Sequence, residues 1–237
     1  MCKDMRNIRK YCILTGLIGL LTAANLHAEV FSAQCIAMPS QGGAGDWSFN
    51  ANTETWNQAG KVPGPSDEVW IDAGKQVHIY EGWHTVSKLE MRSNGGGAYL
   101  EISNGALEVT GIAKFDGNQN SIIVSGGNLN IYWAYGGIDG LRITAGRLEI
   151  EGANWDTIVN LSQSGGTVIL HSLDLAGPGS YAFEYGNTGV LKVETTMDPK
   201  PFFAGYIDKQ IVRPSGAEWV YGTESIDGTP YATLSTR

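Results

Sequence analysis

A unit of about 21 residues recurs along the chain and restricts its possible folds more than any other feature. Each copy has two short segments in which apolar residues alternate with other residues, and a glycine joins the two segments. Alternation with a period of two is typical of β-strands, and glycine is the residue that tolerates a sharp corner between them. The clearest copies are 100–109, 122–131 and 141–150, and looser copies are 159–170 and 183–193.

The glycines at the corners are evenly spaced. Gly105, Gly127, Gly146, Gly166 and Gly189 are separated by 22, 19, 20 and 23 residues. We align an earlier copy, 69–79, with its corner at Gly74, so the separation of 31 residues from Gly74 to Gly105 predicts an insertion near 94–97. Corners need backbone angles that glycine reaches without penalty, which accounts for a content of 32 glycines in 237 residues.

Equivalent apolar positions of the copies indicate how they pack. One such set is Leu107, Leu129, Leu148, Val168 and Leu191, and a second set is Val109, Ile131, Ile150, Leu170 and Val193. A single unit cannot bury its apolar face alone, but stacked units can. We therefore predict an all-β chain that forms a right-handed parallel β-helix, a solenoid of about six coils with end caps. A third strand per coil has room at 112–115 or 173–175.

An antiparallel β-sandwich is the alternative fold, because it also has short strands and regular turns. The evenly spaced glycine corner favours the β-helix, since successive hairpins of a sandwich occupy unlike positions.

The first 28 residues have the order of a secretory signal peptide. Four basic residues precede the apolar run 11–24, and Ala28 ends a small-residue cleavage site. We expect the mature chain to begin at Glu29, to have no membrane span, and to be secreted or at the cell surface. The periplasm is the alternative location. An N-terminal membrane anchor is the alternative. Cleavage would leave Cys35 as the only cysteine, so no internal disulfide could form.

The charge of the mature chain limits its partners. Cleavage removes four basic residues and one acid, which leaves 12 Lys and Arg against 23 Asp and Glu, a net charge of −11. The mature chain has no basic run of the kind that tracks phosphates, so we expect no nucleic acid partner. Acidic polymers are also disfavoured, and neutral glycans or other cell-surface polymers fit better.

The pattern of the chain divides it into four parts. After the signal peptide, we assign 29–66 to an N-terminal entry segment that caps the solenoid, 67–195 to the β-helix repeats and 196–237 to a C-terminal cap. The last part leaves the repeat pattern and is rich in proline and aromatic residues. Caps are expected because the open ends of a solenoid expose unpaired strand edges.

A resemblance to a known group rests mainly on the entry segment. Its residues are Gly45-Asp-Trp47, Thr55-Trp-Asn57, Val62-Pro-Gly64, Asp67-Glu-Val-Trp-Ile71 and Gly74. The chain from about 45 to 195 resembles exported bacterial β-helix proteins of the pectate-lyase-like superfamily, and this segment looks like the entry to repeat-rich surface proteins and adhesins. The resemblance implies export and a β-helix. It implies no single function, because that scaffold hosts lyases, hydrolases, adhesins and inert surface proteins.

One charged cluster is a candidate for catalysis. Polysaccharide elimination needs a base near a sugar ring and a positive charge facing the uronate, and the candidates are Asp139, Arg142, Arg147 and Glu149. Equivalent positions predict one outward ladder of Glu108, Asn130 and Glu149, and another of Glu101, Ile123 and Arg142, on adjacent faces. Solvated ion pairs are the ordinary explanation of such a surface.

The sequence contains no spacing typical of a metal or nucleotide site. His78, His84 and His171 lack the spacing of metal ligands, so we expect no metal site and no cofactor. The dipeptides Asp116-Gly117, Asp139-Gly140 and Asp227-Gly228 indicate turns. Carboxylate and backbone oxygens suit calcium, which leaves calcium as the one cofactor these turns would favour.

Five aromatic residues fall after the second strand of their coils. They are Trp83, Tyr132, Trp133, Tyr135 and Trp155. Exposed rings at one phase of successive coils would stack on sugar rings, so we predict a glycan-binding strip. The alternative is that these rings fill the third side of the core. Neighbours on a strand point to opposite faces, which predicts Tyr132 outward and Trp133 inward.

Three classes of function follow from this pattern. We favour a non-catalytic extracellular or cell-surface protein that acts in adhesion, matrix or glycan binding. A short β-helix polysaccharide lyase or hydrolase is the second class. A structural subunit that stacks end to end is the third.

Overall fold

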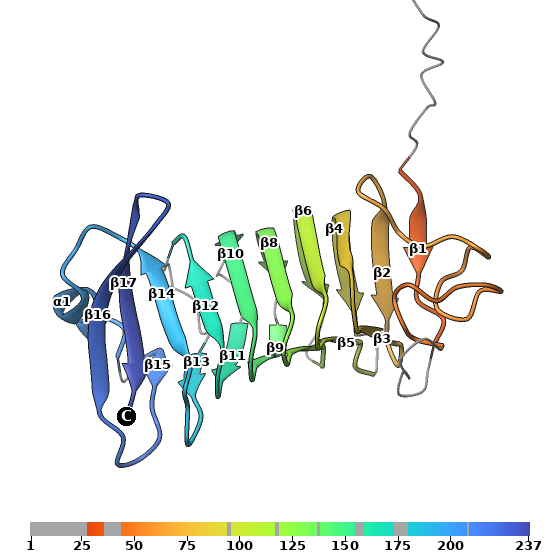
Figure 1. Cartoon of the computed structure of the whole chain (residues 1–237). Helices are drawn as coiled ribbons and strands as arrows, with labels where there is room; N and C mark the ends of the chain where they lie inside the picture. The colour runs from red at the N-terminus through yellow and green to blue at the C-terminus, as the bar shows by residue number, and fades with distance from the viewer. Residues whose placement is uncertain are drawn as a thin grey trace, which may run out of the picture.

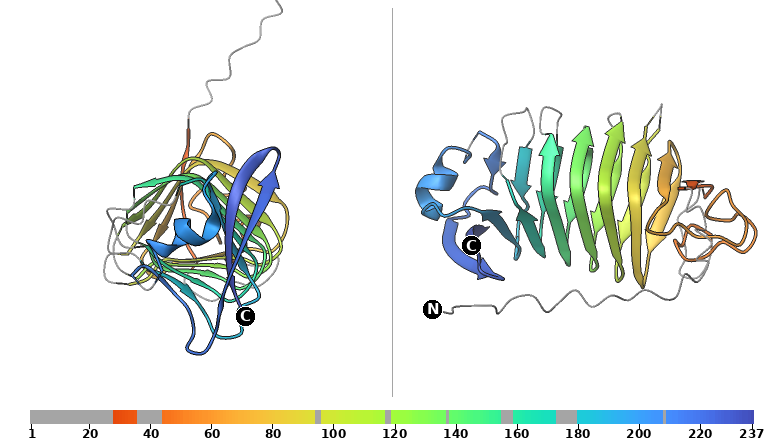
Figure 2. Two further views of the ribbon diagram at one scale, coloured as in Figure 1. Left: turned by 90° about the vertical axis from the view of Figure 1, so that its left-hand side faces the viewer. Right: turned by 90° about the horizontal axis from the view of Figure 1, so that it is seen from above.

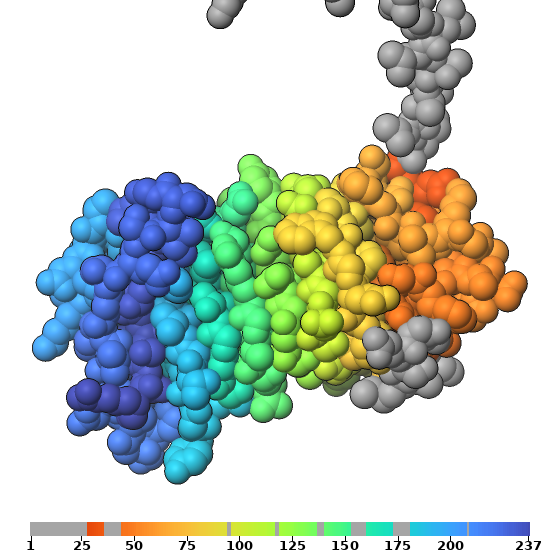
Figure 3. Space-filling model, viewed as in Figure 1, coloured from red at the N-terminus to blue at the C-terminus, as the bar shows by residue number. Residues whose placement is uncertain are grey.

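The computed structural model describes residues 28–35, 44–93, 96–116, 119–136, 138–154, 159–172, 180–207 and 209–237. They form a β-solenoid of about five turns, close to the number of coils predicted (Figure 1). Figure 3 shows the coils packed side by side from the orange N-terminal end to the blue C-terminal end. The signal peptide up to residue 27 and the predicted strand 173–175 lie outside the described residues.

Two sheets make up the solenoid, and the chain passes from one to the other in each coil. The ten-stranded sheet has the order β1 (Val30–Ser32), β2 (Glu68–Asp72), β4 (Trp83–Arg92), β6 (Ala106–Asp116), β8 (Asn128–Gly136), β10 (Arg147–Asn154), β12 (Thr167–Leu170), β14 (Val190–Glu194), β17 (Thr229–Thr236) and β16 (Trp219–Ile226). The seven-stranded sheet has the order β15 (Ile211–Val212), β13 (Ser180–Phe183), β11 (Val159–Gln163), β9 (Ile138–Ile143), β7 (Ser121–Val124), β5 (Tyr99–Ile102) and β3 (Gln76–Ile79).

All strand pairs from β1 to β14 are parallel, as are the pairs of the seven-stranded sheet. Only the last two pairs of the ten-stranded sheet, β14 with β17 and β17 with β16, are antiparallel. This pairing confirms the parallel β-helix and excludes the antiparallel sandwich, whose neighbouring strands would run in opposite directions.

The core lies between the two sheets, and its ladders have the predicted register. Leu107, Leu129, Leu148, Val168 and Leu191 are consecutive partners across five strands, and each is at most 1% exposed. The second predicted ladder, from Val109 to Val193, is also in register and buried. Stacking like residues at the same height buries each apolar face against the next coil, so the repeat forms one continuous core.

The corner glycines lie against the backbone of the preceding coil. A Cβ atom on Gly127 would be 2.2 Å from the carbonyl oxygen of Gly105, and one on Gly146 would be 2.0 Å from that of Gly127. Gly146 also has a φ of 75°, as the corner argument expects, but Gly127 has no positive φ. Close approach between coils is therefore the reason for glycine at residue 127, where the prediction named the backbone angle alone.

The predicted corner of the first copy, Gly74, is wrong. Gly74 lies between β2 and β3, where the chain leaves the ten-stranded sheet, whereas the other corner glycines precede strands that enter it. The equivalent glycine is Gly82, since its carbonyl accepts the backbone hydrogen bond of Ala106 and Trp83 pairs with Ala106. Gly82 is 23 residues before Gly105, so this coil has the ordinary length and needs no insertion.

The predicted third strand at 112–115 is the second half of β6. Between β6 and β8 the register shifts, because Val109 pairs with Ile131 while Ile112 pairs with Trp133. Thr110 and Gly111 thus oppose Tyr132 alone, which is the pattern of a β-bulge and bends the strand. The residues predicted to form a third side of the coil thus continue a long strand of the ten-stranded sheet. Among the described residues, each coil therefore contributes to two sheets.

Two tryptophans close the N-terminal end. Trp47 and Trp56 are fully buried with ring centroids 4.9 Å apart, and Nε1 of Trp56 donates to the carbonyl of Trp47. The backbone of this segment also joins the first coil, since the amide of Trp47 donates to the carbonyl of His78. Apolar rings and satisfied backbone groups therefore cover the open end of the core.

A short helix and a hairpin close the C-terminal end. Helix α1 (Pro199–Ala204) lies over the end of the coils when the molecule is viewed along its length (Figure 2), and its Phe203 is fully buried. The hairpin β16–β17 turns at Asp227 and Gly228, whose φ angles of 50° and 84° confirm the turn predicted there. None of the helical residues that the structure describes forms a stretch capable of spanning a bilayer.

Candidate functional site

The strand β8 carries three exposed aromatic side chains near its carboxyl end. Its buried residues include Leu129, Ile131 and Ala134, so two neighbours between them, Tyr132 and Trp133, both face solvent, with exposed fractions of 56% and 43%. The prediction for Tyr132 is confirmed and the prediction that Trp133 points inward is wrong. The alternation of β8 is interrupted opposite the β-bulge of β6, where Thr110 and Gly111 oppose Tyr132.

The indole of Trp133 lies over a glycine of the next coil. A Cβ atom on Gly152 of β10 would be 2.4 Å from both Cε3 and Cζ3 of Trp133. A larger residue at 152 would displace the ring, so Gly152 allows the indole to lie close to the sheet. Tyr135 follows on the same strand and is also exposed. We call Tyr132, Trp133 and Tyr135 the β8 aromatic group.

The other two residues of the predicted strip are separate from this group. Trp83 is exposed, but it lies at a different height along the strands. It pairs with Ala106 on β6, which pairs with Asn128 on β8, and Asn128 is five residues before Trp133. At about 3.3 Å per residue, Trp83 lies roughly 16 Å away along the strands, in addition to its separation across the sheet. Trp155 lies outside the described residues. The structure therefore brings together three of the five predicted aromatic residues.

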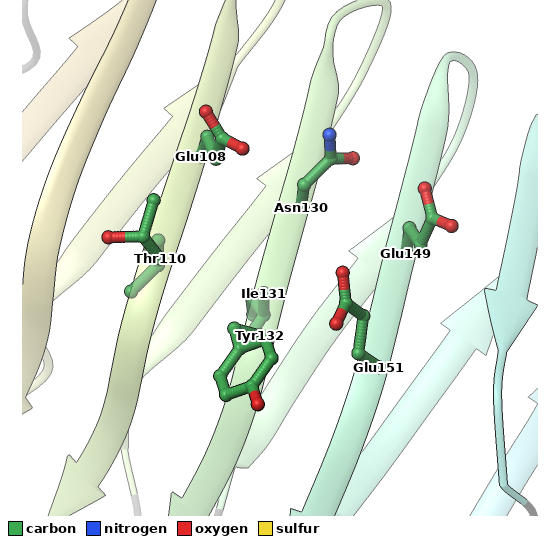
Figure 4. A pocket seen from close by; sticks show the side chains of 8 residues that line it. Glu108, Thr110, Asn130, Ile131, Tyr132, Glu149 and Glu151 are labelled. Carbon is green, nitrogen blue, oxygen red and sulfur yellow. The ribbon is translucent and has the colours of Figure 1, made fainter. Parts of the chain in front are cut away.

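A shallow pocket of about 190 Å³ adjoins Tyr132 on the outer face of β6, β8 and β10 (Figure 4). Its polar and aromatic lining comes from Glu108, Thr110, Asn130, Tyr132, Glu149 and Glu151. Glu108, Asn130 and Glu149 are partners in register, which confirms the predicted ladder. Glu149 and Glu151 come from the same strand two residues apart, so both face outward.

The three carboxylates of the pocket differ in their partners. Glu108 accepts a hydrogen bond from Oγ1 of Thr85 at 3.2 Å. Glu149 accepts one from the Arg147 guanidinium at 2.6 Å and contacts Nε2 of His171 at 2.9 Å. Glu151 is exposed and has no hydrogen bond or ion pair with any residue that the structure describes. The pocket thus contains one unpaired carboxylate beside an aromatic ring.

His171 joins the pocket to β14. Its Nε2 lies 2.9 Å from Glu149, and its Nδ1 lies 2.7 Å from Glu194 on β14. Burial lowers the pKa of His171, but the hydrogen bonds to Glu149 and Glu194 outweigh it, so the pKa is raised overall. Only an imidazolium can donate from both nitrogens at once, so these contacts favour the charged form. Arg147 and His171 together then neutralise Glu149.

The structure does not gather the predicted catalytic cluster. Arg142 lies on β9 in the seven-stranded sheet and pairs with Glu184 at 3.0 Å, while Arg147 and Glu149 lie on β10 in the ten-stranded sheet. The ladder of Glu101, Ile123 and Arg142 is in register as predicted. Asp139 and Gly140 are within β9, so the turn predicted there is wrong, and the Asp139 side chain lies outside the description.

The histidines do not form a metal site in the described part of the chain. His78 contacts Oγ of Ser103 at 2.9 Å, and His84 contacts the carbonyl of Glu81 at 3.1 Å. Across the described ranges, no three His, Cys, Asp or Glu side chains are grouped as metal ligands. Calcium binding stays a prediction.

Four residues of the site were missed by the sequence analysis: Thr110, Glu151, Gly152 and His171. Glu151 could have been found, because it is two residues after Glu149 and a strand places such residues on the same face. Gly152 and His171 gave no such indication. Gly152 belongs to the site because the Trp133 ring of the neighbouring coil lies against it. His171 belongs to it because the imidazole contacts Glu149 and Glu194, which are 22 and 23 residues away in sequence.

The fold and the site thus define a parallel β-solenoid with an aromatic group and an acidic pocket on its outer face. Comparisons with protein-family models, with curated proteins and with solved structures find no match to this chain.

Proposed function

We propose that this protein is a non-catalytic, exported β-helix protein that binds glycans in adhesion or in an extracellular matrix. The observation that carries the proposal is the exposure of Tyr132, Trp133 and Tyr135 on one strand, next to a pocket lined with hydrogen-bonding groups. Large aromatic rings are usually buried in a core, and a protein that leaves three together in water exposes a surface suited to a partner.

The chemistry of a sugar ring fits both parts of this site. One face of a pyranose is apolar and packs on an aromatic face, while its hydroxyl groups need donors and acceptors at the edge. Thr110 and Asn130 supply such groups next to Tyr132. The net charge of the mature chain disfavours uronates and sulfated sugars, so neutral glycans are the first class to test.

Membership of the pectate-lyase-like superfamily and export by a cleaved signal peptide belong to the same proposal. The parallel β-helix and the order of charge, apolar run and small residue before Glu29 support them. N-terminal sequencing of the protein recovered from the culture medium tests export. We expect the sequence to begin at Glu29, and a retained apolar segment would indicate a membrane anchor instead.

A glycan array combined with assays for new reducing ends and unsaturated products tests the function. We expect binding without turnover, and turnover would show a lyase or hydrolase. Tyr132→Ala should weaken binding at least about fivefold, or about 1 kcal/mol of lost aromatic contact, and should leave the melting temperature nearly unchanged because the ring is exposed.

The matched control is Tyr185→Ala, which removes the same exposed side chain from the connection between β13 and β14. It should bind like the wild type. Wild-type protein that binds no glycan, or a Tyr132→Ala protein that binds as well as the Tyr185→Ala protein, would contradict the proposal.

A further inference from the structure

The pocket next to Tyr132 holds more negative charge than the surrounding protein neutralises. Glu108, Glu149 and Glu151 line it, and no lysine or arginine does. The two nearby cations, Arg147 and His171, both contact Glu149. Glu108 has a neutral partner, the Thr85 hydroxyl, and Glu151 has no partner among the described residues. Two carboxylates therefore face the pocket without a counter-ion among the residues that the structure describes.

Asn130 adds a second, independent feature to the pocket floor. It lies in register between Glu108 and Glu149, and its Oδ1 atom is buried without a hydrogen-bond partner within the part of the chain that the structure describes. A buried acceptor without a donor costs about 1–3 kcal/mol, and because this atom is shielded from solvent, a ligand donor recovers that cost only when the Asn130 side chain turns towards the pocket. The pocket is thus rich in acceptors and needs a ligand that carries N–H or O–H donors.

We propose that this pocket binds the protonated amino group of an amino sugar, within a glycan whose ring stacks on Tyr132. The inference rests on the proposed glycan binding and changes the preferred class from neutral to cationic sugars. An ammonium group has three donors, forms a charge-assisted hydrogen bond with the unpaired Glu151, and is attracted to the face of a tyrosine ring, while Glu108 adds negative charge from two strands away. A bare metal ion fits less well, since the described residues contain no group of metal ligands.

Two oligosaccharides of equal length distinguish the contribution of the charged amino group to binding from that of the rest of the sugar. They are a fully deacetylated and a fully N-acetylated oligomer of glucosamine, with binding measured by calorimetry at low salt. We expect the deacetylated oligomer to bind roughly tenfold more tightly, which corresponds to about 1.4 kcal/mol. Added salt should reduce this preference and leave binding of the N-acetylated oligomer nearly unchanged, because salt screens charges at exposed sites.

Glu151→Gln tests the position of the charge, because it keeps the shape of the side chain and removes its charge. The control is Glu184→Gln, which removes the same charge from the seven-stranded side, where Glu184 pairs with Arg142. We expect Glu151→Gln to abolish the preference for the deacetylated oligomer and to keep the melting temperature. Glu184→Gln should retain the preference.

Each other outcome overturns the inference in a distinguishable way. Equal affinity for the two oligomers overturns the amino-sugar site and leaves glycan binding intact. Binding of neither also overturns the amino-sugar site, and the glycan array then decides whether the protein binds any glycan. Equal effects of the two variants would assign the preference to the overall charge. A lysine oligomer that competes as strongly as the deacetylated sugar, and in the same Glu151-dependent way, would show that the ring makes no contribution.

Discussion

Gly127→Ala should destabilise the solenoid strongly although it adds a single methyl group. The new Cβ atom would lie 2.2 Å from the carbonyl oxygen of Gly105 and 2.6 Å from Cγ2 of Ile102. The carbonyl of Gly105 also accepts the hydrogen bond from the amide of Asn128. Relief of the clash therefore moves the backbone of one coil away from the next and weakens that bond.

The expected cost is about 3 kcal/mol, the upper end of the range for overpacked cores, because the obstructing atoms are mainly backbone. The matched control is Gly205→Ala at the end of α1. Gly205 has a φ of −72° and no atom within 4 Å of a built Cβ, so alanine fits there. Reduced entropy of the unfolded chain should make this control neutral or more stable by about 0.4–1 kcal/mol.

Urea denaturation followed by circular dichroism measures both variants against the wild type. The midpoint of Gly127→Ala should fall clearly, and that of Gly205→Ala should stay or rise. Similar midpoints for the two variants would refute the reasoning. They would show that the coils adapt to a side chain at the corner and that the corner glycines do not set the spacing between coils.

Two further predictions concern the core and the charged face. Leu129→Ala should lower the free energy of unfolding by about 2–5 kcal/mol because Leu129 is fully buried in a central coil, whereas Glu184→Gln should change it by no more than about 0.5 kcal/mol. Equal losses of stability in denaturation would show that the inward assignment of Leu129 is wrong. Hydrogen bonding to Arg92, with help from Lys88, lowers the pKa of Glu90 from 4.5 to about 2. Because the pKa of Glu90 is lower in the folded state, its charged form should contribute about 3 kcal/mol to the free energy of unfolding above pH 4.5, and this contribution is lost as the pH falls towards 2. Glu90→Gln should therefore be less stable than the wild type at pH 7. An equal deficit in stability at pH 2 would contradict this account.

The sequence determined the repeat and the core on its own. Alternation with a period of two is a local property of a strand, and the ladder from Leu107 to Leu191 follows once the copies are aligned by their glycines. The register of Glu108, Asn130 and Glu149 follows from the same alignment. These features could be predicted because the copies from residue 100 onward repeat the same pattern at a nearly constant spacing.

Only the tertiary structure decided which way side chains point where the strands bend. Alternation along β8 predicts that Trp133 points inward, but opposite the β-bulge of β6 both Tyr132 and Trp133 face solvent, and Gly152 of the next coil leaves room for the indole. The bulge depends on how the long strands close the coil around the core, which no single copy encodes.

The same distinction applies to the first coil and to the pocket. The sequence offered Gly74 as the corner, and only the pairing of Trp83 with Ala106 identifies Gly82 as its equivalent. Similarly, only the fold shows that Arg147 and His171 neutralise Glu149 while Glu151 stays unpaired. A strand's periodicity tells which face a residue occupies, but the neighbours on that face come from other coils, and their contacts exist only after the coils have stacked.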